Sequence, residues 1–231
     1  MHALLLATFF AAPTADALLH KYDDIMSPAT FDLEAEMVAH RDDGSVRTYK
    51  MRVLKGDGDK VRVYFQEPAS ARGQEMLKVG DNSWIYMPSL KRAVRLANRD
   101  SFMGGDFNNA DVLRVNYEAD YAATLGDSGD PEKLLLELKS KSADAGYDRI
   151  RLFFGQKNEM PVRAEYYAAS GKLLRSADFA EVKDFGGHQR PAHIVMRNEL
   201  AVKRFSELNT TSMKLDIHVP ASKFALDDLG R

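Results

Sequence analysis

The chain has 231 residues, of which 32 are basic and 34 are acidic, and it contains no cysteine. This length suits a single domain, and the near balance of charge excludes the strongly basic surface that nucleic-acid binding needs. Without cysteine the protein can form no disulfide and cannot carry a lipid on an N-terminal cysteine. We therefore expect a soluble protein that is not itself a lipoprotein and that has no nucleic-acid partner.

Residues 1–17 have the pattern of a secretory signal peptide. An apolar run covers residues 4–12, and Ala15-Asp16-Ala17 fits the small-x-small motif of a cleavage site. The run is too short to span a bilayer, although no lysine or arginine precedes it. We predict a cleaved leader over 1–17 and one domain over 18–231, located in the periplasm of a Gram-negative bacterium. The alternative is that the segment forms an N-terminal helix of the folded protein.

A helix is predicted directly after the leader, and strands follow it. Leu18, Tyr22 and Ile25 recur about one helical turn apart. Pro28 ends this helix, because the residue before a proline disfavours helical backbone. From residue 31 the period changes to two, and residues 31–37 alternate apolar with acidic side chains. Alternation of this kind is typical of a strand with one buried face.

The rest of the chain continues in period-two runs separated by turn residues. Strands are predicted at residues 31–37, 46–54, 61–66, 75–79, 84–87, 92–96, 117–125, 132–139, 149–154, 162–168, 172–182, 192–200 and 205–219, with a short helix at 108–115. Short turns between successive strands indicate a meander. We therefore predict about eleven to thirteen strands in one antiparallel sheet, which must curl at that size.

The two faces of the predicted strands differ in polarity. Arg151, Arg163 and Glu165 are typical of a solvated outer face. Residues 134–136 and 153–154 are instead apolar on both faces. Both faces of the sheet must therefore be covered there, either by the N-terminal helix or by a second copy of the chain.

The segment from residue 98 to 111 is hard to place in an ordinary sheet. Phe102, Met103 and Phe107 lie among two glycines and two asparagines, a composition too irregular for a strand and too glycine-rich for a stable helix. These apolar side chains must either enter the core or lie over an apolar opening. Met76 and Met87 are close in sequence, and methionine adapts to apolar partners of irregular shape.

The motif Trp84-x-Tyr86-x-Pro-Ser-x-Lys-Arg, followed by Phe102-Met-Gly-x-Asp-Phe107, resembles the LolA-like outer-membrane lipoprotein-sorting proteins. The resemblance extends from about Tyr22 to near Ala225. It implies a mainly β fold with a few helices: a strongly curved antiparallel sheet, or half-open barrel of about 11 strands, around an apolar cavity capped by helices and a loop. It also implies an acylated lipoprotein or lipid as ligand, an inner-membrane transporter or exporter, and an outer-membrane acceptor.

The candidate ligand-binding residues belong to the cavity wall and its lid. Phe102, Met103 and Phe107 are the predicted lid. Two strand arginines are candidates to hold it by hydrogen bonds if they are buried, and otherwise are simply solvated. The wall and lid-bonding candidates are Phe65, Met76, Trp84, Tyr86, Met87, Arg92 and Arg95. Alternation places Trp84 and Tyr86 on the face opposite to Met87, so these three cannot line one cavity, and each candidate could equally be plain core. On the preceding strand Val61, Val63 and Phe65 share a face, and Arg62 and Tyr64 point the other way.

No motif for catalysis or cofactor binding is visible in the sequence. The chain lacks a nucleophilic cysteine and a Gly-x-Ser-x-Gly elbow, and its six histidines have no metal-ligand spacing. We therefore expect no enzyme, no cofactor and no metal. The predicted function is a periplasmic carrier that shields the acyl chains of lipoproteins during sorting to the outer membrane. The alternatives are a lipid-binding accessory protein of an inner-membrane lipid exporter and a non-binding envelope scaffold with a solid core.

Overall fold

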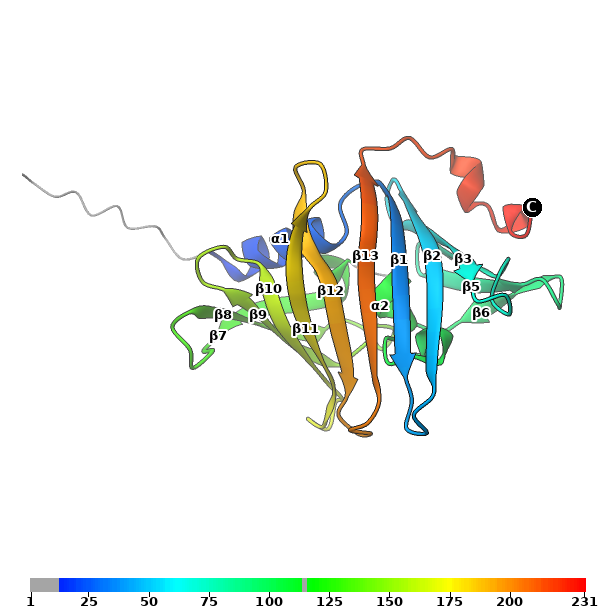
Figure 1. Ribbon diagram of the computed structural model, residues 1–231. Helices are drawn as coiled ribbons and strands as arrows, with labels where there is room; N and C mark the ends of the chain where they lie inside the picture. The colour runs from blue at the N-terminus through cyan, green and yellow to red at the C-terminus, as the bar shows by residue number, and fades with distance from the viewer. Residues whose placement is uncertain (1–12, 114–115) are drawn as a thin grey trace, which may run out of the picture.

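The protein is one antiparallel sheet of 13 strands with short helices on its inner side, in a computed structural model that describes residues 13–113 and 116–231 (Figure 1). The strands are β1 (Phe31–His40), β2 (Val46–Gly56), β3 (Lys60–Glu67), β4 (Glu75–Val79), β5 (Asn82–Met87), β6 (Arg92–Leu96), β7 (Tyr121–Gly126), β8 (Lys133–Ser140), β9 (Arg149–Gly155), β10 (Pro161–Tyr167), β11 (Leu173–Asp184), β12 (Gln189–Asn198) and β13 (Phe205–Leu215). The α-helices are α1 (Ala15–Met26), α2 (Asn109–Leu113) and α3 (Tyr117–Asp120), and the 3₁₀ helices are η1 (Phe102–Gly104), η2 (Ala221–Phe224) and η3 (Leu226–Asp228). The predicted mainly β fold with a curved, open sheet is confirmed.

Two meanders make up the sheet, and they join at its centre. The strand order is β6-β5-β4-β3-β2-β1-β13-β12-β11-β10-β9-β8-β7, so the first and last strands of the chain pair with each other. In Figure 1 these central strands stand side by side, and α1 and α2 lie behind them. We call the side that carries α1 and α2 the concave face and the opposite side the convex face.

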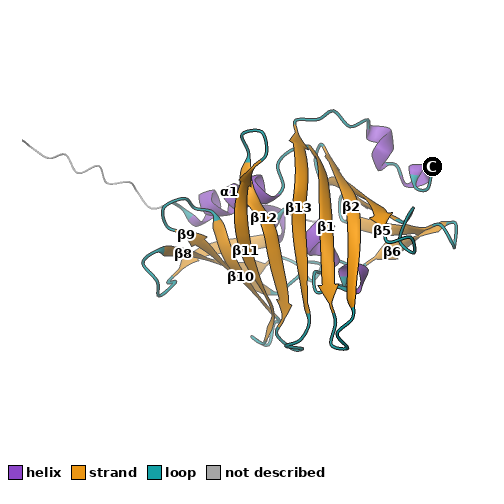
Figure 2. Ribbon diagram, viewed as in Figure 1, coloured by secondary structure: helices purple, strands orange, loops and turns teal. Residues whose placement is uncertain are grey.

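The topology requires one long connection. β6 and β7 follow each other in the chain but form the two opposite edges of the sheet. Residues 97–120, which we call the crossover segment, must therefore pass from one edge to the other across a face. Its described residues form η1, α2 and α3 on the concave side (Figure 2). The predicted meander is thus correct within each half and is interrupted between β6 and β7.

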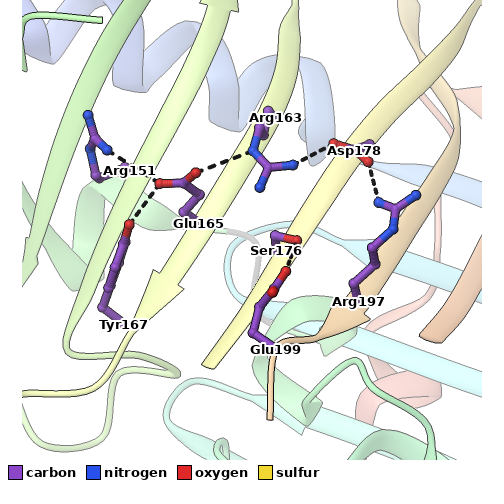
Figure 3. Close-up of polar contacts among 8 residues, drawn as sticks. All are labelled: Arg151, Arg163, Glu165, Tyr167, Ser176, Asp178, Arg197 and Glu199. Atoms are coloured by element: carbon purple, nitrogen blue, oxygen red, sulfur yellow. Dashed lines mark hydrogen bonds and ion pairs between the residues drawn. The ribbon is translucent and has the colours of Figure 1, made fainter. Parts of the chain in front are cut away.

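Alternating side chains give the sheet its two faces. In β1, Phe31, Leu33 and Ala35 are buried on the concave face, and the residues between them are half-buried on the convex face. On the convex face a charged ladder runs across β9 to β12, as expected for a solvated surface (Figure 3). Its members are Arg151, Glu165, Arg163, Asp178 and Arg197, joined in that order.

Several sequence-based boundaries differ from the structure, and three of the differences change an element's end or type. Helix α1 begins at Ala15, with the Thr14 hydroxyl accepting from the Ala17 amide, so it includes the predicted cleavage motif. Residues 1–12 of the predicted leader lie outside the described residues, and the leader stays a prediction. Residues 117–120 form α3 instead of the start of a strand, because Asn116 caps them and Asp23 accepts from the Tyr117 amide. β13 ends at Leu215 rather than at residue 219.

None of the helices in the described part of the chain is both long enough and apolar enough to cross a membrane.

Candidate functional site

A small apolar hollow lies between the concave face of the central strands and α2. It has a volume of about 70 Å³. Most of its lining side chains are apolar and come from the end of α1, from β1, β2, β3, β12 and β13, and from α2; they are Met26, Phe31, Leu33, Ala35, Met51, Val53, Val61, Val112, Leu113, Ile194 and Leu208. Four polar residues, Ser27, Asp111, Arg190 and Thr210, complete the lining.

The volume of the hollow decides what it can hold in this conformation. A water molecule occupies roughly 30 Å³ in the liquid, and pockets for small molecules usually measure roughly 300–1,000 Å³. The hollow is therefore far too small for an acyl chain, and the apolar cavity implied by the family resemblance stays a prediction. The crossover segment occupies the remaining space, so the size of the cavity depends on where this segment lies.

The crossover segment enters the core through two phenylalanines. Phe102 and Phe107 are buried, and the Phe102 amide donates to the Phe107 carbonyl at 2.9 Å. The ring of Phe102 packs on that of Phe65 in β3, with 5.9 Å between the ring centroids. Met103 between them is half-buried with a φ of 51°, and its carbonyl accepts from the Tyr49 hydroxyl. The structure therefore brings Phe65, Phe102, Met103 and Phe107 together.

A buried carboxylate fastens the first half of the crossover segment to the sheet. Asp106 is 1% exposed, and its Oδ2 accepts from the Ser206 hydroxyl of β13 at 3.0 Å. Its Oδ1 accepts from the Asn198 side-chain amide at 3.2 Å and lies 3.5 Å from the Arg204 guanidinium. Sequence reasoning missed Asp106, because an Asp after Gly-Gly has the composition of an ordinary turn.

A second carboxylate fastens α2. Asn108 and Asp111 form a reciprocal cap, in which the Asp111 amide donates to the Asn108 side chain and the Asn108 amide donates to Asp111 Oδ2 at 2.7 Å. Asn108, the first residue of the helix predicted at 108–115, thus caps α2. Asp111 also accepts from the Tyr147 hydroxyl at 2.9 Å, and that hydroxyl accepts from Arg175. Burial raises the pKa of Asp111 to about 6, against the hydrogen bonds that lower it.

Aromatic rings fill the other half of the concave side. Tyr22 of α1 lies 5.0 Å from Tyr117 and 6.2 Å from Phe154, measured between ring centroids. The rings of Tyr147 and Tyr166 pack nearby in a tilted arrangement, with 4.4 Å between their centroids. Burial raises the pKa values of all four tyrosines. The hollow therefore lies on one side of this packed aromatic group.

Basic side chains surround the C-terminal end of α1, next to the hollow. Arg190 Nη1 donates to the Met26 carbonyl at 3.1 Å, His188 donates to the Ile25 carbonyl at 2.9 Å, and Lys55 donates to the Ser27 carbonyl at 2.6 Å. Cations here satisfy carbonyls that have no partner within the helix and complement its dipole. Burial lowers the pKa of Arg190 to about 10.

Trp84 and Tyr86 do not line the hollow. They pack in a second apolar cluster on the convex face, together with Leu77 of β4 and with Phe224 and Leu229 of the C-terminal segment. This placement corrects the expectation that they form the cavity wall, and the predicted alternation explains it. Whether any of the candidate residues contacts a ligand stays a prediction.

Of the remaining candidates, one lies in the concave core and the others lie outside it. Met76 is buried in the concave core, whereas Met87 is half-buried and belongs to neither apolar cluster of the described residues. Arg92 and Arg95 are exposed on β6, and Arg95 donates to Asn82 of the neighbouring strand. The expected hydrogen bonds from these arginines to the lid are therefore replaced by those of Asp106 and Asp111.

The described residues contain no group of three or more His, Asp or Glu side chains that could hold a metal ion.

Comparisons with known proteins agree with this architecture. Residues 57–231 match a family model described as an uncharacterized protein. The crystal structure of a LolA superfamily protein from Nitrosomonas europaea is 30% identical to the chain, covers 94% of this chain and 99% of that one, and superposes with a TM-score of 0.84. A comparison with curated proteins found no match.

Two further structures share the fold at lower identity. A putative outer membrane lipoprotein-sorting protein domain from Vibrio parahaemolyticus is 21% identical, with a TM-score of 0.79 over 94% of this chain and 98% of that one. A DUF1329 family protein from Desulfovibrio piger is 20% identical, with a TM-score of 0.82 over 94% of this chain and all of that one. At this identity they establish the fold alone.

Proposed function

Because the chain belongs to the LolA superfamily, we propose that it is a periplasmic carrier that shields the acyl chains of lipoproteins on their way to the outer membrane. The observation that supports this most is the arrangement of the concave face. An apolar face of a 13-stranded open sheet is covered by α1 and one irregular crossover segment rather than by a second sheet. In this proposal an inner-membrane transporter supplies the cargo and an outer-membrane acceptor receives it.

Transfer energies explain why such a carrier is needed. Exposing a methylene group to water costs about 0.8 kcal/mol, so a sixteen-carbon chain costs on the order of 12 kcal/mol. Hydrocarbon therefore crosses an aqueous compartment only when an apolar surface covers it. Apolar contact is non-directional, so a face such as that of Phe31, Leu33 and Met51 can accept chains of different shape.

The proposal requires that the crossover segment move away from the sheet. With a volume of about 70 Å³ the hollow holds no acyl chain until α2, whose Val112 and Leu113 line it, moves away from the sheet. The segment is fastened by polar groups, Asp106 and Asp111, for which water can substitute when it is displaced. A second conformation only a few kcal/mol higher would suffice for ligand-dependent opening.

The solid-core scaffold is the competing function, and the small hollow favours it. A binding experiment separates the two: an acylated lipopeptide and the same peptide without acyl chains are titrated into the protein by calorimetry. The carrier proposal predicts saturable binding of the acylated form alone. No binding of either peptide would leave the scaffold as the better account.

A cavity-filling variant tests where the chains bind. Ala35 lines the hollow, so Ala35→Leu should weaken lipopeptide binding while the fold is kept. Thr48→Leu, at an exposed position of β2, is the matched control and should bind as the wild type does. Mass spectrometry of the protein isolated from the periplasm then distinguishes a bound lipoprotein from a free lipid, the cargo expected for an accessory protein of a lipid exporter.

A further inference from the structure

Arg190 occupies an unusual place on the concave face. It is the first of a row of inward residues on β12, and the row continues with Ala192, Ile194 and Met196, all of them buried. The Arg190 side chain is itself only 5% exposed and lines the hollow beside Ile194 and Leu208. The guanidinium of Arg190 thus lies at one end of a row of β12 side chains that is otherwise apolar.

No carboxylate of the described residues pairs with Arg190, although the C-terminal end of α1 compensates part of its charge. Its polar contacts are the Met26 carbonyl, the carbonyl of Pro191 at 3.5 Å and the Met213 sulfur at 3.9 Å. Among the described residues no carboxylate lies within ion-pair distance of it, and residues 1–12 and 114–115 contain no Asp or Glu. Arg62, the other described arginine that is buried to this degree, pairs with both Glu75 and Asp228.

An unpaired buried cation is costly, and it persists where function or compensation requires it. One hydrogen bond to Met26 satisfies only part of a guanidinium that has five N–H donors. Its Nη2 group makes no hydrogen bond to any described residue, and the planar fork suits the two oxygens of an acid group.

We propose that Arg190 binds the acid group, a carboxylate or a phosphate, of an amphiphile whose hydrocarbon chain lies along the concave face. This inference rests on the proposed carrier function and, of the two cargoes considered there, favours a free lipid, one that has an acid group. Asp111 faces the same hollow and would repel the acid group. The anion is therefore bound in the open conformation, after α2 has carried Asp111 away from the sheet.

The test compares three ligands with the same chain: dodecanoate, dodecyl phosphate and dodecanol, each titrated into the full-length protein by calorimetry. We expect the wild type to bind at least one of the acids about tenfold or more tightly than the alcohol, the range of a charged hydrogen bond. The tighter of the two acids identifies the acid group. In Arg190→Gln this preference should disappear while dodecanol binding is kept, and Arg190→Lys should retain part of it.

Arg163→Gln, an arginine of the convex ladder, is the matched control and should leave all three affinities unchanged. Equal binding of acids and alcohol by the wild type would overturn the anion site and leave the carrier intact, even if Arg190→Gln fails to fold. Unchanged acid binding by a folded Arg190→Gln would overturn it as well. If the wild type binds none of the three, the anion site fails, and the lipopeptide titration decides the carrier function separately.

Discussion

Phe102 connects the crossover segment to the core through its fully buried ring, which packs on Phe65. Removing a buried phenylalanine ring typically costs about 3–5 kcal/mol, because the apolar contacts are lost and a cavity remains. We therefore expect Phe102→Ala to lower the free energy of unfolding by about 3 kcal/mol in chemical denaturation. Leu90→Ala, at an exposed position, is the control and should change it by less than about 0.5 kcal/mol. An equally small effect for Phe102→Ala would show that the ring is not held in the core.

Asp111 makes the stability of the protein depend on pH. Its folded-state pKa of about 6 exceeds the usual carboxyl value of 3.8, so the folded protein holds this proton more firmly than the unfolded chain. The free energy of unfolding should therefore rise as the pH falls from about 7 towards 4, by at most about 3 kcal/mol from this group. Asp23, whose pKa burial raises to about 6, and His20, whose pKa is raised by Glu118, act in the same direction.

Denaturation at a series of pH values checks this dependence. Asp111→Asn removes the titrating group but keeps its shape, so the rise in stability between pH 7 and 5 should be smaller than in the wild type. Asp148 and Asp228 have lowered pKa values, set mainly by Arg99 and Arg62, and they affect stability only at more acidic pH. A profile that is identical in Asp111→Asn and the wild type would contradict the assignment.

At the scale of elements, the C-terminal segment is held on the convex face by a buried ion cluster. Arg62 of β3 is 1% exposed, pairs with Glu75 and Asp228, and also donates to the Lys223 carbonyl at 2.7 Å. These bonds hold η2 and η3 over Trp84 and Tyr86. Gly230 follows with a φ of 77° and lies directly against the Tyr86 ring, so a larger residue cannot occupy its place.

Removing the arginine should therefore loosen this segment. Arg62→Ala leaves Glu75 buried without its partner, and we expect it to lower the free energy of unfolding by about 3 kcal/mol. Limited proteolysis should then cut between residues 216 and 231 faster than in the wild type. Arg163→Ala in the exposed ladder should cost less than about 1 kcal/mol and leave the cleavage unchanged. Equal effects of the two variants would mean that the buried cluster does not hold the segment.

The sequence predicted correctly on which face of the sheet a strand side chain lies, but it did not predict which segments cover that face. Alternation correctly placed Phe65 opposite to Arg62 and separated Trp84 from Met87, because side-chain direction in a strand has a strict period of two. It could not indicate that residues 221–229 cover Arg62 and Trp84, since this contact joins segments far apart in the chain. Trp84 was therefore predicted to line the cavity because it is large and apolar, whereas its side chain lies on the convex face under the C-terminal segment.

At the scale of the whole molecule, the unpredicted feature is the route of the crossover segment. Period-two runs identify strands but not which strands are neighbours, and successive strands are usually adjacent. Here β1 pairs with β13, which leaves β6 and β7 at opposite edges. The aromatic residues of the crossover segment therefore lie on the concave face because the connection has to cross it. The same topology places the crossover segment as a cover over the apolar face.

The central claim is that this cover must move before an acyl chain can bind, and an engineered disulfide tests it most directly. A Cβ atom at Gly105 would lie 3.1 Å from the Ser206 Oγ atom, and the chain has no other cysteine to interfere. Gly105 has a φ of −82°, which any residue adopts. The pair Gly105→Cys and Ser206→Cys should thus link the crossover segment to β13.

The measurement is acylated-lipopeptide binding by this double variant, oxidised and then reduced, with Gly105→Cys alone as the control. We predict that the oxidised protein binds no lipopeptide and that reduction restores binding to the level of the single variant. Equal affinity of the oxidised and reduced forms would contradict the claim, because the chain would then bind while the crossover segment stays fixed to the sheet.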